Sequence, residues 1–248
     1  MRATVYGIPG SHPVKSAVLM LERKRIGHRV VQVPSVLCRP ALRAMGFPGS
    51  TVPAVKIDGR RIQTTRAIAR RLDQIRPHPP LFPRDPGARA AVEEAERWGD
   101  EVLQPVPRRL AYATMRRDRS GMASFFDGPM LGLSPRAAAA TAGPIVAMGS
   151  RINSAGDATA RADISALPQL LDHVDALLAD GVIGAREPNA ADFQIAPSVR
   201  LMMLFEDLKP AIEGRPAAEH ATRTVPHYAG HMPATLPREW LTELRSPA

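Results

Sequence analysis

The first part of the chain alternates short apolar runs with an amphipathic segment. Residues 3–6 and 29–33 are short and apolar, the second rich in β-branched side chains, and each has the length of a buried strand. Between them, residues 14–25 repeat apolar side chains at helical spacing, and Gly27 follows as a helix-terminating signal. The pattern predicts a strand, a helix and a second strand.

A second group of elements follows a loop or short helix at residues 34–43. Residues 52–57 read as a third strand that begins at a proline, and Asp58-Gly59 is a strong hairpin signal. Residues 60–63 then return as a fourth strand, and Thr64 or Thr65 caps the helix that follows. The predicted order is β-α-β-(loop or helix)-β-β-α.

The pattern changes after a proline-rich linker that ends at Pro86. No convincing strand follows, and the apolar periodicity is helical throughout. Asn189 and Asp192 have the spacing of a capping box, which indicates a role in folding. We expect helices at 87–115 (with a kink near Pro105 and Pro107), from Ser134 with an interruption at 143–144, at 164–179 and at 193–208, and an irregular chain beyond Pro216.

Composition limits the classes of function. The net charge is +9 and comes mostly from arginine, but aromatic residues for base stacking are scarce, so anionic small molecules are favoured over nucleic acid. The single cysteine, Cys38, excludes an intramolecular disulfide and a Cys-x-x-Cys site. No signal peptide pattern or apolar run of about 18 residues is present, so we expect a cytoplasmic protein without a membrane segment.

A strand end, a Gly/Pro turn and a helix start meet within residues 6–13. Ser11 falls at the start of the helix, where backbone N–H groups are free and the helix dipole is positive. One interpretation is that Ser11 only caps the helix. The other is that this N-terminus binds an anion or stabilises a thiolate. The adjacent His12 is either a general base or a residue that faces solvent or packs locally.

These elements together resemble a glutathione transferase over roughly residues 3–216. The resemblance implies an α/β thioredoxin-like N-terminal domain followed by an all-α helical-bundle domain. The expected parts are a thiol-binding domain at 1–78, an electrophile-site domain at 87–216 and a tail at 217–248.

Three motifs carry the resemblance. Ser11-His-Pro-Val-Lys15 resembles the Ser-x-Pro-x-Arg motif of the serine-type classes, which implies that Ser11 donates a hydrogen bond to the glutathione sulfur. Val52-Pro53 resembles the family's Val-Pro with its cis peptide bond, where the backbone pairs with the tripeptide. Thr64-Thr65 resembles the Glu/Gln-Ser pair that grips the γ-glutamyl end, but Thr64 is shorter than the usual residue.

The electrophile pocket is less defined by the sequence. Trp98, Tyr112 and Met115 lie on the first long helix and are candidate lining residues, although core positions explain them as well. Tyr6 and His12 are further candidates close to Ser11. In this family the dimer buries the helix that carries Arg66 and Arg70, so we expect these arginines either to pair with residues such as Glu93 or Glu94 of a second subunit or to form a solvated basic face.

The predicted function is thiolate transfer from glutathione, a co-substrate, to a hydrophobic electrophile, as in detoxification, by a homodimer that needs no metal or organic cofactor. Two alternatives remain open. One is a non-catalytic binding or structural protein on the same fold, which the short Thr64 favours. The other is a transferase that uses a related low-molecular-weight thiol.

Overall fold

A computed structural model describes residues 1–34, 37–126, 128, 132–242 and 244 of the chain. The predicted loop at 34–43 and the predicted tail each include residues outside these ranges. The N-terminal elements follow the predicted order: β1 (Arg2–Gly7), α1 (His12–Arg23), β2 (Gly27–Gln32), α2 (Cys38–Ala44), β3 (Ala54–Ile57), β4 (Arg60–Gln63) and α3 (Thr65–Ile75).

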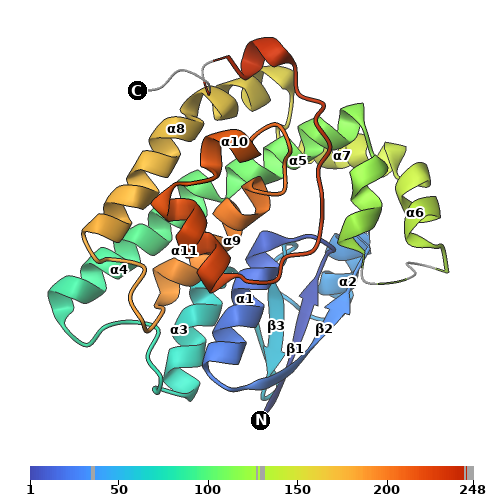
Figure 1. Cartoon of the computed structure of the whole chain (residues 1–248). Helices are drawn as coiled ribbons and strands as arrows, with labels where there is room; N and C mark the ends of the chain where they lie inside the picture. Colours follow the sequence, from blue (N-terminus) through green and yellow to red (C-terminus); the bar gives the residue numbers. More distant parts are fainter. Residues whose placement is uncertain (35–36, 127, 129–131, 243, 245–248) are drawn as a thin grey trace.

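The four strands form one mixed sheet in the order β2-β1-β3-β4. β2 runs parallel to β1, while β3 is antiparallel to both β1 and β4. Because side chains alternate across a strand, Val5 and Val55 face the main core with α1 and α3. Ala54 belongs instead to a smaller apolar cluster with Leu42 of α2. The sheet is therefore covered on both faces (Figure 1).

Helices make up most of the chain after the prolines, and none of the described residues there forms a strand of the sheet. The most buried of them is α9, which packs against α1, α4 and α11. The elements are α4 (Pro86–Trp98), the π-helical turn η2 (Gly99–Leu103), α5 (Pro105–Arg117), the 3₁₀ helix η3 (Ser120–Phe125), α6 (Pro135–Thr141), α7 (Gly143–Ile152), α8 (Asp157–Ala179), α9 (Ala190–Met202), α10 (Lys209–Ile212), α11 (Pro216–Thr224) and η4 (Arg238–Trp240).

The predicted capping box is confirmed. The Asn189 side chain accepts hydrogen bonds from the backbone N–H groups of Ala191 and Asp192, and the Asp192 carboxylate accepts one from the N–H of Asn189. Asp192 is fully buried and also accepts from the N–H of Gly184 at 2.7 Å. This carboxylate therefore joins the start of α9 to the loop that precedes it.

Three helix predictions differ from the structure. The long first helix is interrupted by η2, a wider turn directly before Pro105, where the Gln104 N–H bonds to the carbonyl of Gly99. The helix predicted at 193–208 ends at Met202, and α8 begins seven positions earlier than predicted, at Asp157. The expectation of an irregular chain beyond Pro216 is wrong at its start, because α11 occupies this segment.

The tail segment, residues 225–236, runs from α11 across the start of α1 and then up past the turn that follows α9 (Figure 1). Met232 forms a parallel bridge to Phe205. Asp207 accepts hydrogen bonds from the N–H groups of Thr235 and Leu236 at 2.8 and 2.9 Å. The tail segment is therefore held by specific bonds to the turn that follows α9.

Among the described helices, none combines the length and the apolar character that spanning a membrane requires.

Candidate functional site

Three turns meet at one end of the sheet because of its register. Tyr6 of β1 is paired with Ala54 of β3, and Ala54 is paired with Gln63 of β4. The chain leaves β1 and β4 just after this row and enters β3 just before it. The turn that carries Ser11, the Val52-Pro53 pair and the Thr64-Thr65 pair therefore lie at the same edge of the sheet.

Ser11 is the N-cap of α1. Its Oγ accepts a hydrogen bond from the backbone N–H of Val14 at 3.4 Å, and Pro13 occupies the first turn. A hydroxyl has one proton to donate besides its two acceptor sites, so the cap leaves the Ser11 proton free for another partner. No acidic residue lies in the first turn of α1, so its positive end is not neutralised there.

A second helix N-terminus, that of α3, points to the same edge. The side chain of Thr64 caps it by accepting from the N–H of Ala67, and Thr64 has a φ of +69°, which is unusual for a β-branched residue. The Oγ1 of Thr65 is buried and has no hydrogen-bond partner among the described residues. The first turn of α3 also lacks an acidic residue.

Val52 and Pro53 precede β3, whose ladder begins at Ala54. The peptide bond between them is cis, which is the isomer that the resemblance implies. Gln63 holds the loop before them, since its side chain accepts from the N–H of Gly49 at 2.5 Å and donates to the carbonyl of Thr51 at 2.9 Å.

His12 is turned into the interface between the sheet and the helices. The residue is 3% exposed, and its Nε2 lies 3.1 Å from the carbonyl oxygen of Gln104 at the start of α5. Burial, reinforced by the positive charge of Arg108, lowers the pKa of His12 to about 3. The expectation that this side chain faces solvent or packs locally is wrong, since it bonds to a residue far along the chain.

The four remaining candidates are spread over the molecule. Tyr6 packs edge-to-face on Phe47, with ring centroids 5.5 Å apart, on the α2 side of the sheet. Trp98 packs against His173 of α8 with the two rings tilted and their centroids 4.2 Å apart. Met115 packs against the main core, and the ring of Tyr112 lies directly on Gly149 of α7.

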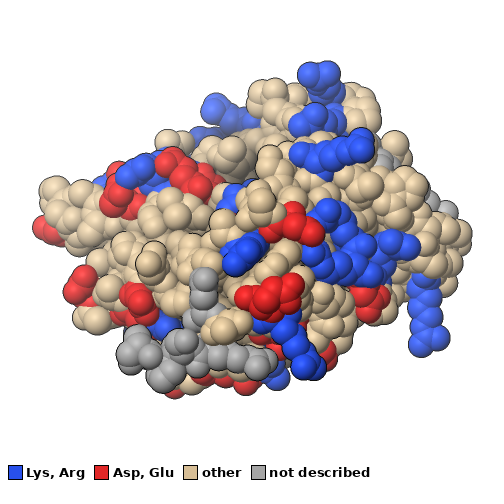
Figure 2. Space-filling view, turned by 90° about the horizontal axis from the view of Figure 1, so that it is seen from above, with Lys and Arg blue, Asp and Glu red and all other residues tan. Residues whose placement is uncertain are grey.

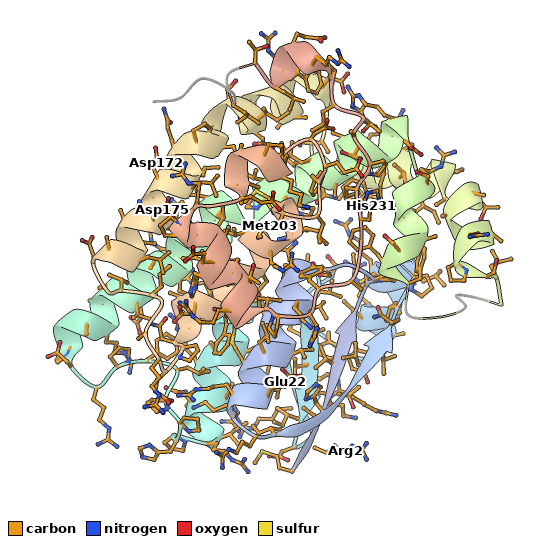
Figure 3. The ribbon with its side chains drawn as sticks, viewed as in Figure 1. Arg2, Glu22, Asp172, Asp175, Met203 and His231 are labelled. Atoms are coloured by element: carbon orange, nitrogen blue, oxygen red, sulfur yellow. The ribbon has the colours of Figure 1, made fainter. Side chains whose placement is uncertain are left out.

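The start of α1 is covered from above by two aromatic residues that the sequence patterns do not single out. The hydroxyl of Tyr228, in the tail segment, donates a hydrogen bond to the carbonyl of Gly10 at 2.8 Å. The ring of Phe125, at the end of η3, packs on Gly10 and on Gly230. Further along the tail segment, the N–H of His231, labelled in Figure 3, donates to the Oγ of Ser124 at 2.8 Å. The tail segment and η3 together close one side of the Ser11 turn.

The arginines of α3 find partners within the chain. Arg70 donates to the buried carboxylate of Glu96 at 2.7 Å, and Arg66 lies 3.4 Å from Glu101. The acidic residues named from the sequence are used elsewhere, since Glu93 pairs with Arg89 and Glu94 with Arg97. Arg66 and Arg70 are therefore paired within the chain, and their pairing with a second subunit stays a prediction.

One further group at this interface was missed by the sequence analysis. Gln104, Arg108 and Tyr112 are spaced four residues apart, so they share one face of α5. At one end of this face the Gln104 backbone carbonyl is the partner of His12, and at the other end the Tyr112 ring lies on Gly149 of α7. Arg108 lies four residues before Tyr112, and this helical spacing could have identified it from the sequence. No cluster of His, Cys, Asp or Glu side chains suited to a metal ion occurs among the described residues.

The domain that carries this edge of the sheet is similar to a known family. Residues 5–80 match the family model described as glutathione S-transferase, N-terminal domain. Among curated proteins, no sequence matches the chain.

Solved structures resemble the whole fold at low sequence identity. FzlA from C. crescentus is 20% identical, with a TM-score of 0.61, over 89% of this chain and 86% of that one. A GST-like protein from Pseudomonas syringae is 18% identical, with a TM-score of 0.56, over 100% of this chain and 75% of that one. A glutathione S-transferase from Methylobacterium radiotolerans, in complex with glutathione sulfonate, is 14% identical, with a TM-score of 0.53, over 90% of this chain and 88% of that one.

Proposed function

We propose that this chain, which has the glutathione transferase fold and whose residues 5–80 form a glutathione S-transferase N-terminal domain, binds glutathione at the edge where β1, β3 and β4 meet. There it transfers the thiol to an electrophile. The observation that carries the proposal is the convergence of two helix N-termini, both free of acidic residues in the first turn, beside the Val52-Pro53 pair. Two positive helix ends suit a ligand with a thiolate at one end and a carboxylate at the other.

Ser11 acts on the sulfur. Its hydroxyl donates a hydrogen bond to the thiolate sulfur, and the N-terminus of α1 adds its partial positive charge. A hydrogen bond to a charged group contributes about 1.5–3 kcal/mol, and each pKa unit corresponds to about 1.4 kcal/mol, so the pKa of the thiol falls by one to two units. The cap and the thiolate roles of Ser11 use different parts of one hydroxyl and are compatible.

The γ-glutamyl end of glutathione binds at the start of α3. The unpartnered Oγ1 of Thr65 and the unusual backbone of Thr64 support this position, because a buried polar atom without a partner calls for one. The ligand reaches Thr65 by a small movement of this turn, since Oγ1 is buried. Thr64 is too short to add the contact that a longer residue makes in the family.

A second candidate is a non-catalytic binding protein on the same fold. The cover that Tyr228 and Phe125 place over Gly10 favours it, because it narrows access to the Ser11 turn. The same geometry accommodates a related thiol in place of glutathione. Activity with glutathione and an aryl chloride separates these candidates.

We expect the Ser11→Ala variant to lower kcat/KM with glutathione and chlorodinitrobenzene roughly tenfold to a hundredfold at neutral pH, the rate equivalent of the one to two pKa units above. In this reaction the thiolate sulfur forms a C–S bond with the ring carbon, and chloride leaves with the electron pair of the C–Cl bond. The loss should shrink as the pH rises, because free thiolate becomes abundant near pH 8.5.

Ser134→Ala is the matched control. Ser134 caps α6 with the same geometry, accepting from the N–H of Ala137 at 3.3 Å, but lies away from the sheet edge. Both variants should lose about 1 kcal/mol of stability as N-cap deletions, and only Ser11→Ala should lose activity. Equal activity in the two variants would rule out the role given to Ser11.

A further inference from the structure

Arg108 differs from the other arginines of α5 in lacking a carboxylate partner. Its neighbour Arg109 is held by Asp163 through two hydrogen bonds of 2.7 and 2.5 Å. Arg116 and Arg117 both pair with Asp157. Among the described residues no carboxylate oxygen lies within 4.0 Å of the Arg108 guanidinium, and its buried Nε has no acceptor.

The Arg108 side chain is also partly buried, so its charge is less well solvated than that of an exposed arginine. Burial lowers the pKa of its guanidinium from the usual value, and burial raises the pKa of the nearby Asp100 carboxyl. Asp100 is engaged elsewhere, since it accepts from the side chain of Gln104 at 3.2 Å. The Arg108 side chain is only partly exposed, and a partly desolvated cation gains more from an anionic partner than a fully solvated one.

The place of Arg108 in the fold connects it with the thiol site. Residues before and after Arg108 in the chain both contact the start of α1. Gln104, one helical turn earlier, bonds to His12 through its carbonyl, and Phe125, further along, packs on Gly10. Arg108 acts electrostatically on the His12 ring, directly after Ser11. The guanidinium therefore lies close to the residue that follows Ser11, so an acceptor held by Arg108 would lie near a thiol bound by Ser11.

The Nε atoms of Arg71 and Arg119 are also buried without an acceptor among the described residues, but neither arginine acts on the His12 ring beside Ser11. Lys and Arg side chains gather on the face seen from above the helical part, with Asp and Glu side chains close by (Figure 2). Exposed cations are solvated and need no ligand. A depression of about 550 Å³ lined by Arg23, Lys24, Arg25 and Arg76 is likewise explained within the chain, because Lys24 and Arg76 cap each other's helix carbonyls.

We infer that Arg108 binds a carboxylate of the electrophile, so that the acceptor of this transferase is an anionic electrophile rather than a purely hydrophobic one. This inference rests on the proposed function. A planar guanidinium binds a carboxylate through two parallel hydrogen bonds, which fixes the orientation of the acceptor as well as its position. The thiolate then attacks the electrophilic carbon of the held molecule, forming the C–S bond as the leaving group departs with its electron pair.

The test compares chloronitrobenzoate with its methyl ester, which has the same reactive carbon but no charge. In the Arg108→Met variant, kcat/KM for the benzoate should fall tenfold to a hundredfold, the range of one charge-assisted hydrogen bond, and kcat/KM for the ester should change less than about threefold. Arg108→Lys should recover part of the activity with the benzoate. Arg116→Met, on the exposed side of α5, is the matched control and should behave as the wild type.

An equal loss with both acceptors would overturn the inference, because Arg108 would then act on the thiolate or on the fold. A binding measurement keeps this result separate from a failure of the proposed function. Calorimetry without glutathione should show that chloronitrobenzoate binds the wild type and binds Arg108→Met at least tenfold more weakly, with melting temperatures recorded for both. No binding to the wild type, or equal binding to both proteins, would contradict the inference even if no turnover is found.

Discussion

The Asp192→Ala variant should lose about 3–5 kcal/mol of unfolding free energy, the largest loss we expect from a single substitution outside the site. The carboxylate is fully buried and accepts two backbone hydrogen bonds of 2.7 Å, from Gly184 and Asn189. Each bond to a charged acceptor contributes about 1.5–3 kcal/mol, and its deletion leaves a buried N–H without a partner. Urea unfolding followed by circular dichroism measures the loss.

Glu213→Ala is the control for Asp192→Ala. Glu213 pairs with Lys209 on the exposed surface of the chain, where single ion pairs contribute little. We therefore expect no clear change in its urea midpoint.

The Asp192→Ala protein that remains folded at low temperature should bind glutathione as the wild type does, since Asp192 acts on folding. A loss below about 1 kcal/mol would show that the capping box does not hold α9 in place.

Acidification should destabilise the protein through His12. The folded-state pKa of this ring is about 3, against the ordinary value of 6.5, because the buried ring stays neutral. Below pH 6.5 the unfolded chain takes up a proton at this position and the folded chain does not. The unfolding free energy therefore falls as the pH drops from 6.5 towards 3, by about 2 kcal/mol at pH 5.

The contribution of His12 is isolated by comparison with His12→Gln, which retains an N–H donor for the Gln104 carbonyl but does not titrate. The difference in unfolding free energy between the two proteins should be constant above pH 7 and should shift by about 2 kcal/mol between pH 7 and pH 5. Parallel pH profiles would mean that the ring reaches solvent in the folded state. Because His12 is neutral at pH 7, it fits a role in positioning α1 against α5 better than a role as a charged catalytic group.

The N-terminal fold could be predicted because its signals are local. The Asp58-Gly59 turn, with positive φ at both residues, and the N-cap of Ser11 depend on neighbouring residues only. The break in the long first helix was predicted to within a turn, because Pro105 opens α5 and the helix is interrupted directly before it. The form of the break, one wider π-helical turn at η2, is not specified by the proline pattern.

Only part of the candidate site could be predicted from the sequence, because only part of it depends on neighbouring residues. Ser11, Val52, Pro53, Thr64 and Thr65 lie in short motifs, and the sheet register brings them together. The residues that cover or border them come from far along the chain. Tyr228 reaches Gly10 across more than two hundred positions, and His12 reaches Gln104 across ninety-two. Such long-range contacts are fixed by helix packing, which a periodicity of apolar residues does not specify.

The most direct test of the account is a calorimetric titration of the wild-type protein with glutathione at pH 7, repeated in two buffers with different ionisation enthalpies. The account predicts saturable binding at millimolar concentration or tighter, with an apparent enthalpy that depends on the buffer, because a thiol that binds as a thiolate releases its proton. Absence of saturable heat at high millimolar glutathione would contradict the assignment of this edge of the sheet as a glutathione site.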